Sequence, residues 1–378
     1  MPRTHLPHPA APEAEAIGSE AAGPRTRGSA GPGRTGASLR RRPLMAGLVG
    51  AVGLTAACGP SSGSAGEGGS DGGGSDGGGS AAGFPLELAN CEATLTFDAP
   101  PERIVLLESA PVTTLDGIGV LDRVVSRAGA FPPGYYDEDL AARIEEIPTL
   151  SDEIDASGHL QISQEMVIAQ EPDIVFGLPD GVTREAMADA GAQVVVQNIY
   201  CATGGHRSSF ETLHEQIDAY GRIFDHGEQA EQLSTSLQER IDAASESAKD
   251  LATATAAVLY PSVGGGPLYT YGAASMVTAQ LDALGIENVF ADTEERVFEI
   301  SAEPLLAADP DVLIVLHQTD GDGSDVAEEM ISQDQLGSLR AVQDQALLPL
   351  LFNFAEPASP LVVDGLERIH EWLVELER

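Results

Sequence analysis

One segment of this 378-residue chain occurs twice. Residues 162–176 read ISQEMVIAQEPDIVF and residues 300–314 read ISAEPLLAADPDVLI, with identity at six of fifteen positions. Each copy predicts a short helix that ends before a proline, followed by an aspartate and a buried strand. The copies start 138 residues apart, which is too far for a solenoid repeat of about 20–50 residues. The chain is therefore predicted to contain two similar lobes, each with a helix–turn–strand unit in the same place.

The two predicted helices also begin alike. Ser163 and Ser301 stand at the helix starts, and we expect each hydroxyl to accept a hydrogen bond from a free backbone N–H of the first turn. Glu165 and Glu303 follow in that turn, where the positive end of the helix dipole favours an acid. Spacing alone leaves open whether these acids serve only their helices or also face a partner.

Short apolar runs rich in β-branched residues alternate with helical patterns along the rest of the chain. Strands that are apolar on both faces and joined by helices are typical of parallel sheets covered on both sides. The prediction is an α/β protein with two Rossmann-like lobes and mostly parallel sheets, spanning 84–207 and 250–378. The predicted strands are Ile104–Leu107, Ile174–Gly177, Gln193–Val196, Ala256–Tyr260 and Val312–Leu316.

A helical tract joins the lobes. Apolar residues recur at helical spacing between residues 208 and 249, which predicts one long connecting helix. Asp225, His226 and Gly227 form a sequence that could break this helix in the middle.

The first part of the chain has the features of an export signal. Arg40, Arg41 and Arg42 precede the apolar run 44–57, which is too short to span a membrane, and residues 54–58 resemble a bacterial lipobox ending at Cys58. We predict a signal peptide with a disordered N-terminal extension over 1–57. Lipidated Cys58 then begins a flexible Gly/Ser/Asp linker over 58–83. A chance cysteine after an ordinary signal peptide is the alternative, and both the Sec and the twin-arginine routes fit.

Two cysteines remain in the exported part, Cys91 and Cys201. An even pair outside the cell favours one disulfide. No matching histidine spacing accompanies the pair, so a structural bridge is preferred to a metal site.

Composition and motifs exclude several functions. A net charge of −39, from 59 acidic and 20 basic residues, argues against nucleic-acid binding. No GxGxxG follows a predicted strand, no P-loop or GxSxG elbow appears, and no HxxxH or HxH pair occurs in the exported part, so neither catalysis nor a protein-only metal site is predicted. A membrane-tethered hydrolase on a two-lobe fold remains the alternative from another class.

Several stretches together resemble the substrate-binding proteins of ABC importers for iron–siderophore complexes, haem and cobalamin, the type with a rigid helical connector. They are PERIV at 101–105, LDGIGVLDRVV at 115–125, the two repeated units, and IENVFAD at 286–292. The resemblance covers roughly 91–378. It implies a monomeric, non-enzymatic lipoprotein on the outer face of the cell membrane. Its transported ligand would be an Fe(III) chelate, with cobalamin, haem or a bare metal ion as alternatives, and no covalent cofactor is expected except the lipid on Cys58.

The resemblance also implies a partner. In such proteins one glutamate on each lobe engages arginine pockets of a permease dimer that works with a cytoplasmic ATPase. The matching positions here are Glu165 and Glu303.

The ligand is expected in a cleft between the lobes, where the loops after the strands meet. Tyrosine and phenylalanine there can stack on a siderophore or a macrocycle, and the scarce arginines Arg207 and Arg296 can pair with an anionic chelate. Ordinary loop packing or a surface salt bridge is the alternative for each residue. The candidates are Ser109, Tyr135, Tyr136, His206, Arg207, Tyr269, Tyr271, Arg296, His317 and Phe354.

Overall fold

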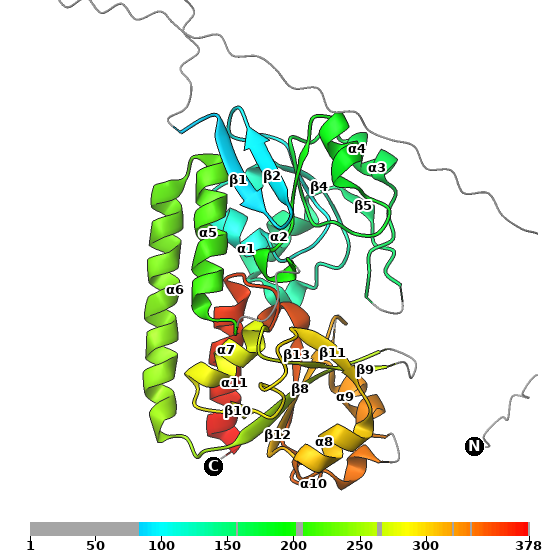
Figure 1. Ribbon diagram of the computed structural model, residues 1–378, viewed down its shortest axis with the longest axis vertical. Helices are drawn as coiled ribbons and strands as arrows, with labels where there is room; N and C mark the ends of the chain where they lie inside the picture. The colour runs from blue at the N-terminus through cyan, green and yellow to red at the C-terminus, as the bar shows by residue number, and fades with distance from the viewer. Residues whose placement is uncertain are drawn as a thin grey trace, which may run out of the picture. The chain divides into compact units, whose positions relative to one another are not determined.

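The computed structural model describes residues 83–155, 158–201, 207–262, 267–319, 321–332 and 335–376 (Figure 1). All of these residues belong to one structural unit, Ser75–Arg378. The predicted signal peptide, Cys58 and the linker up to residue 82 lie outside the described residues, as does His206. Within the described ranges, no helix combines the length and hydropathy needed to cross a membrane.

The two copies of the repeated segment form the same unit in two separate sheets. In the first copy α3 (Gln164–Ile168) leads into β6 (Ile174–Phe176), and in the second α8 (Ala302–Ala308) leads into β12 (Val312–His317). Each of these strands pairs in parallel with the first strand of its own sheet, β6 with β3 and β12 with β8. The prediction of two similar α/β lobes is confirmed.

The first sheet has five parallel strands in the order β5-β4-β3-β6-β7. The central strands β3 and β6 are completely buried, as expected of a sheet that is covered on both faces. The remaining bounds in this lobe are β3 Ile104–Leu106, β4 Val124–Ala128, β5 Thr149–Ser151, β7 Gln193–Val195, α1 Val112–Gly117, α2 Glu138–Glu145 and α4 Arg184–Asp189.

The second sheet has six strands and is mixed. The order is β11-β9-β8-β12-β13, with β10 also on β8; β9 is antiparallel to both its neighbours and the other pairs are parallel. The remaining bounds in this lobe are β8 Thr255–Pro261, β9 Leu268–Tyr271, β10 Glu287–Asn288, β11 Val297–Ile300, β13 Leu347–Leu351, α7 Met276–Ala283, α9 Ser324–Ile331, α10 Arg340–Gln343 and α11 Leu361–Leu376.

The aspartate of each repeated segment fixes the start of its sheet. One carboxylate oxygen of Asp173 accepts from the backbone N–H groups of Glu102 and Arg103, at 2.8 and 2.9 Å. One oxygen of Asp311 accepts from the N–H and the hydroxyl of Thr255, both at 2.8 Å. These bonds lower the pKa of Asp311. The repeat in sequence is therefore also a repeat of one anchoring contact.

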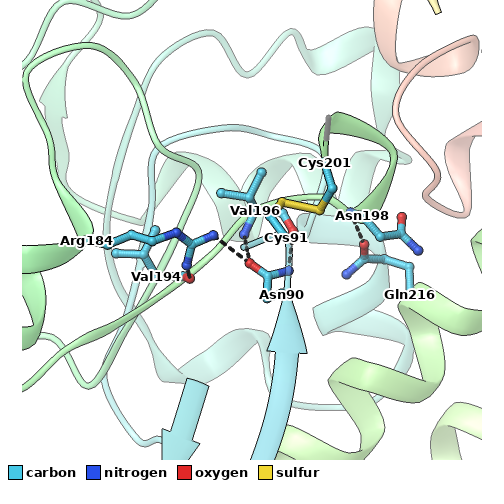
Figure 2. The surroundings of a disulfide bond; sticks show 8 residues. All are labelled: Asn90, Cys91, Arg184, Val194, Val196, Asn198, Cys201 and Gln216. Atoms are coloured by element: carbon cyan, nitrogen blue, oxygen red, sulfur yellow. Dashed lines mark hydrogen bonds between the residues drawn. A yellow bond between two sulfur atoms is a disulfide. The ribbon is translucent and has the colours of Figure 1, made fainter. Parts of the chain in front are cut away.

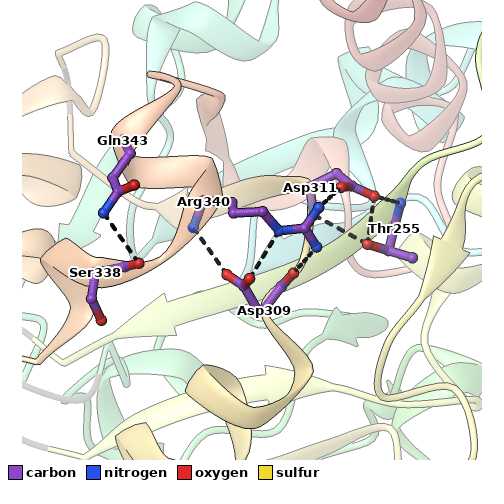
Figure 3. Close-up of polar contacts among 6 residues, drawn as sticks. All are labelled: Thr255, Asp309, Asp311, Ser338, Arg340 and Gln343. Carbon is purple, nitrogen blue, oxygen red and sulfur yellow. Dashed lines mark hydrogen bonds and ion pairs between the residues drawn. The ribbon is translucent and has the colours of Figure 1, made fainter.

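An arginine forms hydrogen bonds at the C-terminal end of each repeated helix. In the second lobe the Arg340 guanidinium lies between Asp309 and Asp311, with Nε 2.8 Å from Asp309 and Nη1 2.6 Å from Asp311 (Figure 3). In the first lobe Arg103 donates to the backbone oxygens of Glu171 and Gln170 at the equivalent helix end. α8 ends at Asp309 in a left-handed conformation, and after α3 the equivalent left-handed residue is Glu171, three residues beyond the helix; each turns the chain towards the strand.

The predicted serine caps are wrong in detail. Ser163 and Ser301 do occupy the N-cap positions, but in the described structure neither hydroxyl accepts from a helix N–H. The backbone N–H of Glu165 and, to a smaller extent, the hydroxyl of Ser163 lower the pKa of Glu165.

The tract between the lobes contains two helices, so the single helix over 208–249 is wrong and the break is present. α5 (Phe210–Phe224) ends at Asp225 in a left-handed conformation, and α6 (Gly227–Ser247) follows. A Cβ at Gly221 would lie 2.5 Å from the Cβ of Ala230, so glycine lets the two helices pack closely. The 21-residue α6 is the long connecting helix.

α6 contacts both lobes. Its Leu233 packs against Gly117 at the end of α1, where an added Cβ would lie 2.8 Å from the leucine side chain. Further along, Arg240 donates to Glu367 and Asp364 of α11 at 2.5–2.9 Å. The connection is thus packed against side chains at both ends.

A hairpin precedes the first sheet, with β1 (Leu86–Asn90) antiparallel to β2 (Ala93–Phe97). Asn90 extends it onto the end of β7, because its amide donates to Val196 O at 2.7 Å and accepts from Val196 N–H at 2.9 Å (Figure 2). A disulfide between Cys91 and Cys201 joins the same two segments across a separation of 110 residues.

Candidate functional site

The two lobes meet through buried polar contacts between loops that follow strands. Asn353, after β13, donates from its side-chain amide to the hydroxyl of Ser109, after β3, at 2.9 Å. The backbone N–H of Asn353 donates to the hydroxyl of Tyr135 at 3.1 Å. All three residues are buried. The carboxyl ends of strands from both sheets therefore converge on one region, which is where α/β folds bind ligands.

Aromatic rings line this region. The ring of Tyr135 lies edge-on to Phe354 of the second lobe and to Tyr136, at centroid distances of 5.5 and 5.9 Å. Tyr260 and Phe352 form a further edge-on pair at 5.7 Å. Rings in these arrangements offer flat apolar surface together with hydroxyl groups, which suits a large organic ligand.

A charged group lies buried beside the rings. The carboxyl of Glu356 is completely buried, and Oε1 accepts from the backbone N–H of Met276, the first residue of α7, at 2.9 Å. The guanidinium of Arg296 is 3.7 Å from Glu356 Oε2, beyond a hydrogen bond, and lies 4.8 Å from the ring centroid of Tyr200 in the first lobe. Arg296 therefore connects a buried acid of one lobe to an aromatic face of the other.

A second acid approaches from the first lobe. Gln197 donates from its amide to Glu108 Oε1 and to the hydroxyl of Tyr220, both at 3.2 Å. Burial raises the pKa of Glu108 to about 7, against the smaller opposing effect of Gln197. Burial likewise raises the pKa of Glu356 to about 7, opposed by Arg296 and the Met276 N–H. Tyr200 links the two acids: its backbone N–H donates to the carbonyl of Gln197, and its ring faces Arg296, the ion-pair partner of Glu356.

Several buried atoms of this cluster have no hydrogen-bond partner among the described residues: Gln197 Oε1, Glu356 Oε2 and Arg296 Nη1. Buried polar groups are normally paired, and leaving one unpaired costs about 1–3 kcal/mol. Glu356 Oε2 and Arg296 Nη1 face each other at 3.7 Å, so Gln197 Oε1 is the acceptor of this cluster that has neither a hydrogen bond nor an ion pair among the described residues.

Replacing Glu108 by glutamine is expected to raise the free energy of unfolding at pH 8 by about 1–3 kcal/mol, because the buried carboxylate disappears. The pKa of Glu108 rises from 4.5 to about 7 on folding, so the folded protein keeps a proton that the unfolded chain has lost. The stability of the unaltered protein therefore falls as the pH rises from 4.5 through 7. Urea unfolding at pH 8 and pH 4.5 checks this, with the exposed Glu239→Gln as control. An equal gain at both pH values would contradict it.

The structure brings six of the ten predicted cleft residues into this region: Ser109, Tyr135, Tyr136, Tyr271, Arg296 and Phe354. Arg207 is instead exposed and held by Asp282 in a two-point ion pair, with N–O distances of 2.5 and 2.8 Å. The ring of His317 is buried and bonds to the Thr319 hydroxyl at 3.0 Å. Tyr269 lies half-buried in β9.

Sequence reasoning missed Glu108, Gln197, Tyr200, Asn353 and Glu356 as individual site residues. Glu108, Tyr200 and Asn353 lie in loops that the strand pattern identifies as facing the cleft. Nothing in the sequence predicts that acids from two lobes share one buried cluster, since the contacts join residues far apart in the chain.

The two acids of the repeated segments lie outside the buried cluster. Glu165 and Glu303 are both exposed, in the first turns of α3 and α8. Beside Glu165 is a groove of about 730 Å³, whose lining includes Asp152, Glu153 and Met166. Met166 is 42% exposed.

A family profile and a solved structure both relate this chain to transport binding proteins. The sequence profile of a family described as periplasmic binding protein matches residues 104–348. A crystal structure described as an ABC-type Fe3+-hydroxamate transport system from Saccharomonospora viridis DSM 43017 is 51% identical, with a TM-score of 0.73 over 76% of this chain and 99% of that chain.

More distant relatives bind other ligands by their descriptions. A periplasmic heme-binding protein from Roseiflexus sp. RS-1 is 18% identical, with a TM-score of 0.57 over 73% of this chain and 99% of that one, and shows the fold alone. A cobalamin-binding protein of Halobacterium salinarum is 27% identical over 240 residues, 62% of this chain. The matched region spans 59% of that relative's length.

Proposed function

Because the chain belongs to the periplasmic binding protein family, we propose that it captures a ferric chelate outside the cell membrane and delivers it to an ABC importer. The observation that carries this proposal is the 51% identity to the Fe3+-hydroxamate transport protein over 76% of the chain. The family is one of transport binding proteins, so the described cluster is interpreted as a binding site rather than a catalytic one.

The geometry of the site supports a chelate rather than a bare ion. The partly exposed rings of Tyr136, Tyr260 and Phe352 offer surface for an organic shell around the iron, and the buried rings of Tyr135 and Phe354 pack behind them. Ser109 and Asn353 add polar groups at the same place. A ferric hydroxamate carries both an apolar backbone and oxygen atoms, and fits such a surface.

Delivery requires a permease, and Glu165 and Glu303 are the proposed contacts. Both are exposed and both begin a helix of the repeated unit, so one acid is available on each lobe. Exposed acids steer and orient an arginine-bearing partner, so docking should weaken with salt. The acidic groove and exposed Met166 beside Glu165 add area to the contact on the first lobe. The proposed partner is a permease dimer with a cytoplasmic ATPase.

Anchoring is proposed through a lipid on Cys58, which lies outside the described residues. The protein would then act as a monomer on the outer face of the membrane. The disulfide between Cys91 and Cys201 suits an exported protein, because such bonds persist in oxidising compartments.

Titration of the purified protein with a ligand panel tests the proposed ligand. We expect a ferric hydroxamate to bind more tightly than ferric catecholate, ferric citrate, haem or cobalamin. Calorimetry should accompany tyrosine fluorescence, since the lone tryptophan, Trp372, lies in α11 and is partly exposed. Tighter binding of haem or cobalamin than of every ferric chelate would contradict the proposal.

A further inference from the structure

We propose that Glu108, Gln197 and Glu356 form a subsite for a positively charged, hydrogen-bond-donating arm of the ligand. The inference rests on the proposed capture of a ferric chelate and names a chemical group that this chelate should carry. It is argued from which charges in the site are already paired and which atoms are left over.

The two arginines that the sequence offers to an anionic ligand are already engaged with acids. Arg207 holds both carboxylate oxygens of Asp282. Arg296 lies against Glu356 and the ring of Tyr200. Two other arginines are engaged with aromatic rings. The guanidinium carbon of Arg127 lies 4.9 Å from the ring centroid of Phe131, and that of Arg368 lies 4.3 Å from the ring centroid of Phe354.

The buried cluster itself has two carboxyl groups and one guanidinium. Glu108 accepts a hydrogen bond from Gln197 and forms no ion pair with any described residue. Arg296 is the cation that acts on Glu356. A bound ammonium would balance the second carboxylate and so reduce the cost of burying it.

Two of the three unpartnered atoms are acceptors, and the donor, Arg296 Nη1, lies 3.7 Å from one of them, Glu356 Oε2. Gln197 is 1% exposed and Glu356 is 0% exposed, and each has one oxygen with no hydrogen-bond partner among the described residues. These oxygens are acceptors, whereas Arg296 Nη1 is the one unpartnered donor of this cluster in the described part of the chain. A group with several N–H donors satisfies such a set, and a carboxylate or catecholate oxygen does not.

Residues of both lobes contribute to the subsite. Glu108, Gln197 and Tyr200 come from the first lobe, and Arg296 and Glu356 from the second. An ammonium held there contacts both lobes at once. The same contacts that select the ligand therefore also favour closure around it.

A matched pair of chelates tests the inference. Ferrioxamine B is a ferric trihydroxamate with one free ammonium, and its N-acetyl derivative has the same iron centre without that charge. We expect the full-length purified protein to bind the ammonium form about 10-fold more tightly, which corresponds to about 1.4 kcal/mol. Glu108→Gln and Glu356→Gln should each reduce this preference, and the exposed Glu239→Gln should retain it.

The outcomes separate the two proposals. If both chelates bind equally to the unaltered protein, the subsite is refuted while capture of a ferric hydroxamate stands. The same conclusion follows if both glutamine variants keep the full preference. If neither chelate binds, the subsite and the proposed hydroxamate ligand are both refuted. The comparison in the unaltered protein decides the matter even where a variant fails to fold.

Discussion

Reversing both exposed acids, Glu165→Lys with Glu303→Lys, is expected to reduce uptake of the ferric chelate to background. Each lobe offers one of these acids at a helix start, and an arginine pocket that attracts a carboxylate repels an ammonium. Ligand affinity should be unchanged, because neither acid belongs to the buried cluster. Uptake is measured with radiolabelled iron in cells that carry the cognate permease, and affinity is measured by calorimetry.

The control for this experiment reverses two exposed acids outside the repeated units, Glu239→Lys with Glu287→Lys. This variant has the same change in net charge, so it separates a local contact from a general loss of negative charge. Full uptake by the Glu165/Glu303 variant would refute the docking assignment. Loss of uptake in the control as well would mean that overall charge, and not these positions, governs delivery.

Removing the disulfide by Cys91→Ser with Cys201→Ser is expected to lower the free energy of unfolding by about 4–5 kcal/mol. The bond closes a loop with a separation of 110 residues, and the chain-entropy model assigns about that value to a loop of this length. The hydrogen bonds of Asn90 remain in the variant, so the hairpin should still dock in the folded state.

Urea unfolding without reductant measures this effect. The unaltered protein with reductant provides the control, since reduction should reproduce most of the loss without any substitution. A change below about 1 kcal/mol in both would show that the unfolded chain is not restrained by this bond.

The repeat made the two-lobe fold predictable because identical residues carry identical contacts. Asp173 and Asp311 each hold the backbone that opens the first strand of their sheet, and a sequence comparison detects such a pair directly. The sequence indicates a possible helix break near Asp225 but does not decide between one helix and two. The structure decides it through the close approach of Gly221 and Ala230, which is a tertiary contact.

The site was less predictable, because its charges are set by partners far along the chain. Arg207 and Arg296 look equivalent in sequence, yet one meets Asp282 at the surface and the other Glu356 in the interior. Glu108 is one acid among 59 acidic residues and acquires its raised pKa only from burial between loops. Loop positions were therefore predictable, and their electrostatics were not.

The connecting helix α6 has a consequence for cargo release. It packs on α1 through Leu233 and is hydrogen-bonded to α11 through Arg240, so it links the two lobes. We expect a helix held at both ends to limit spontaneous separation of the lobes, and so to slow dissociation of a ligand bound between them. Release of the ligand then depends on the transporter, which must bind both lobes and move them apart.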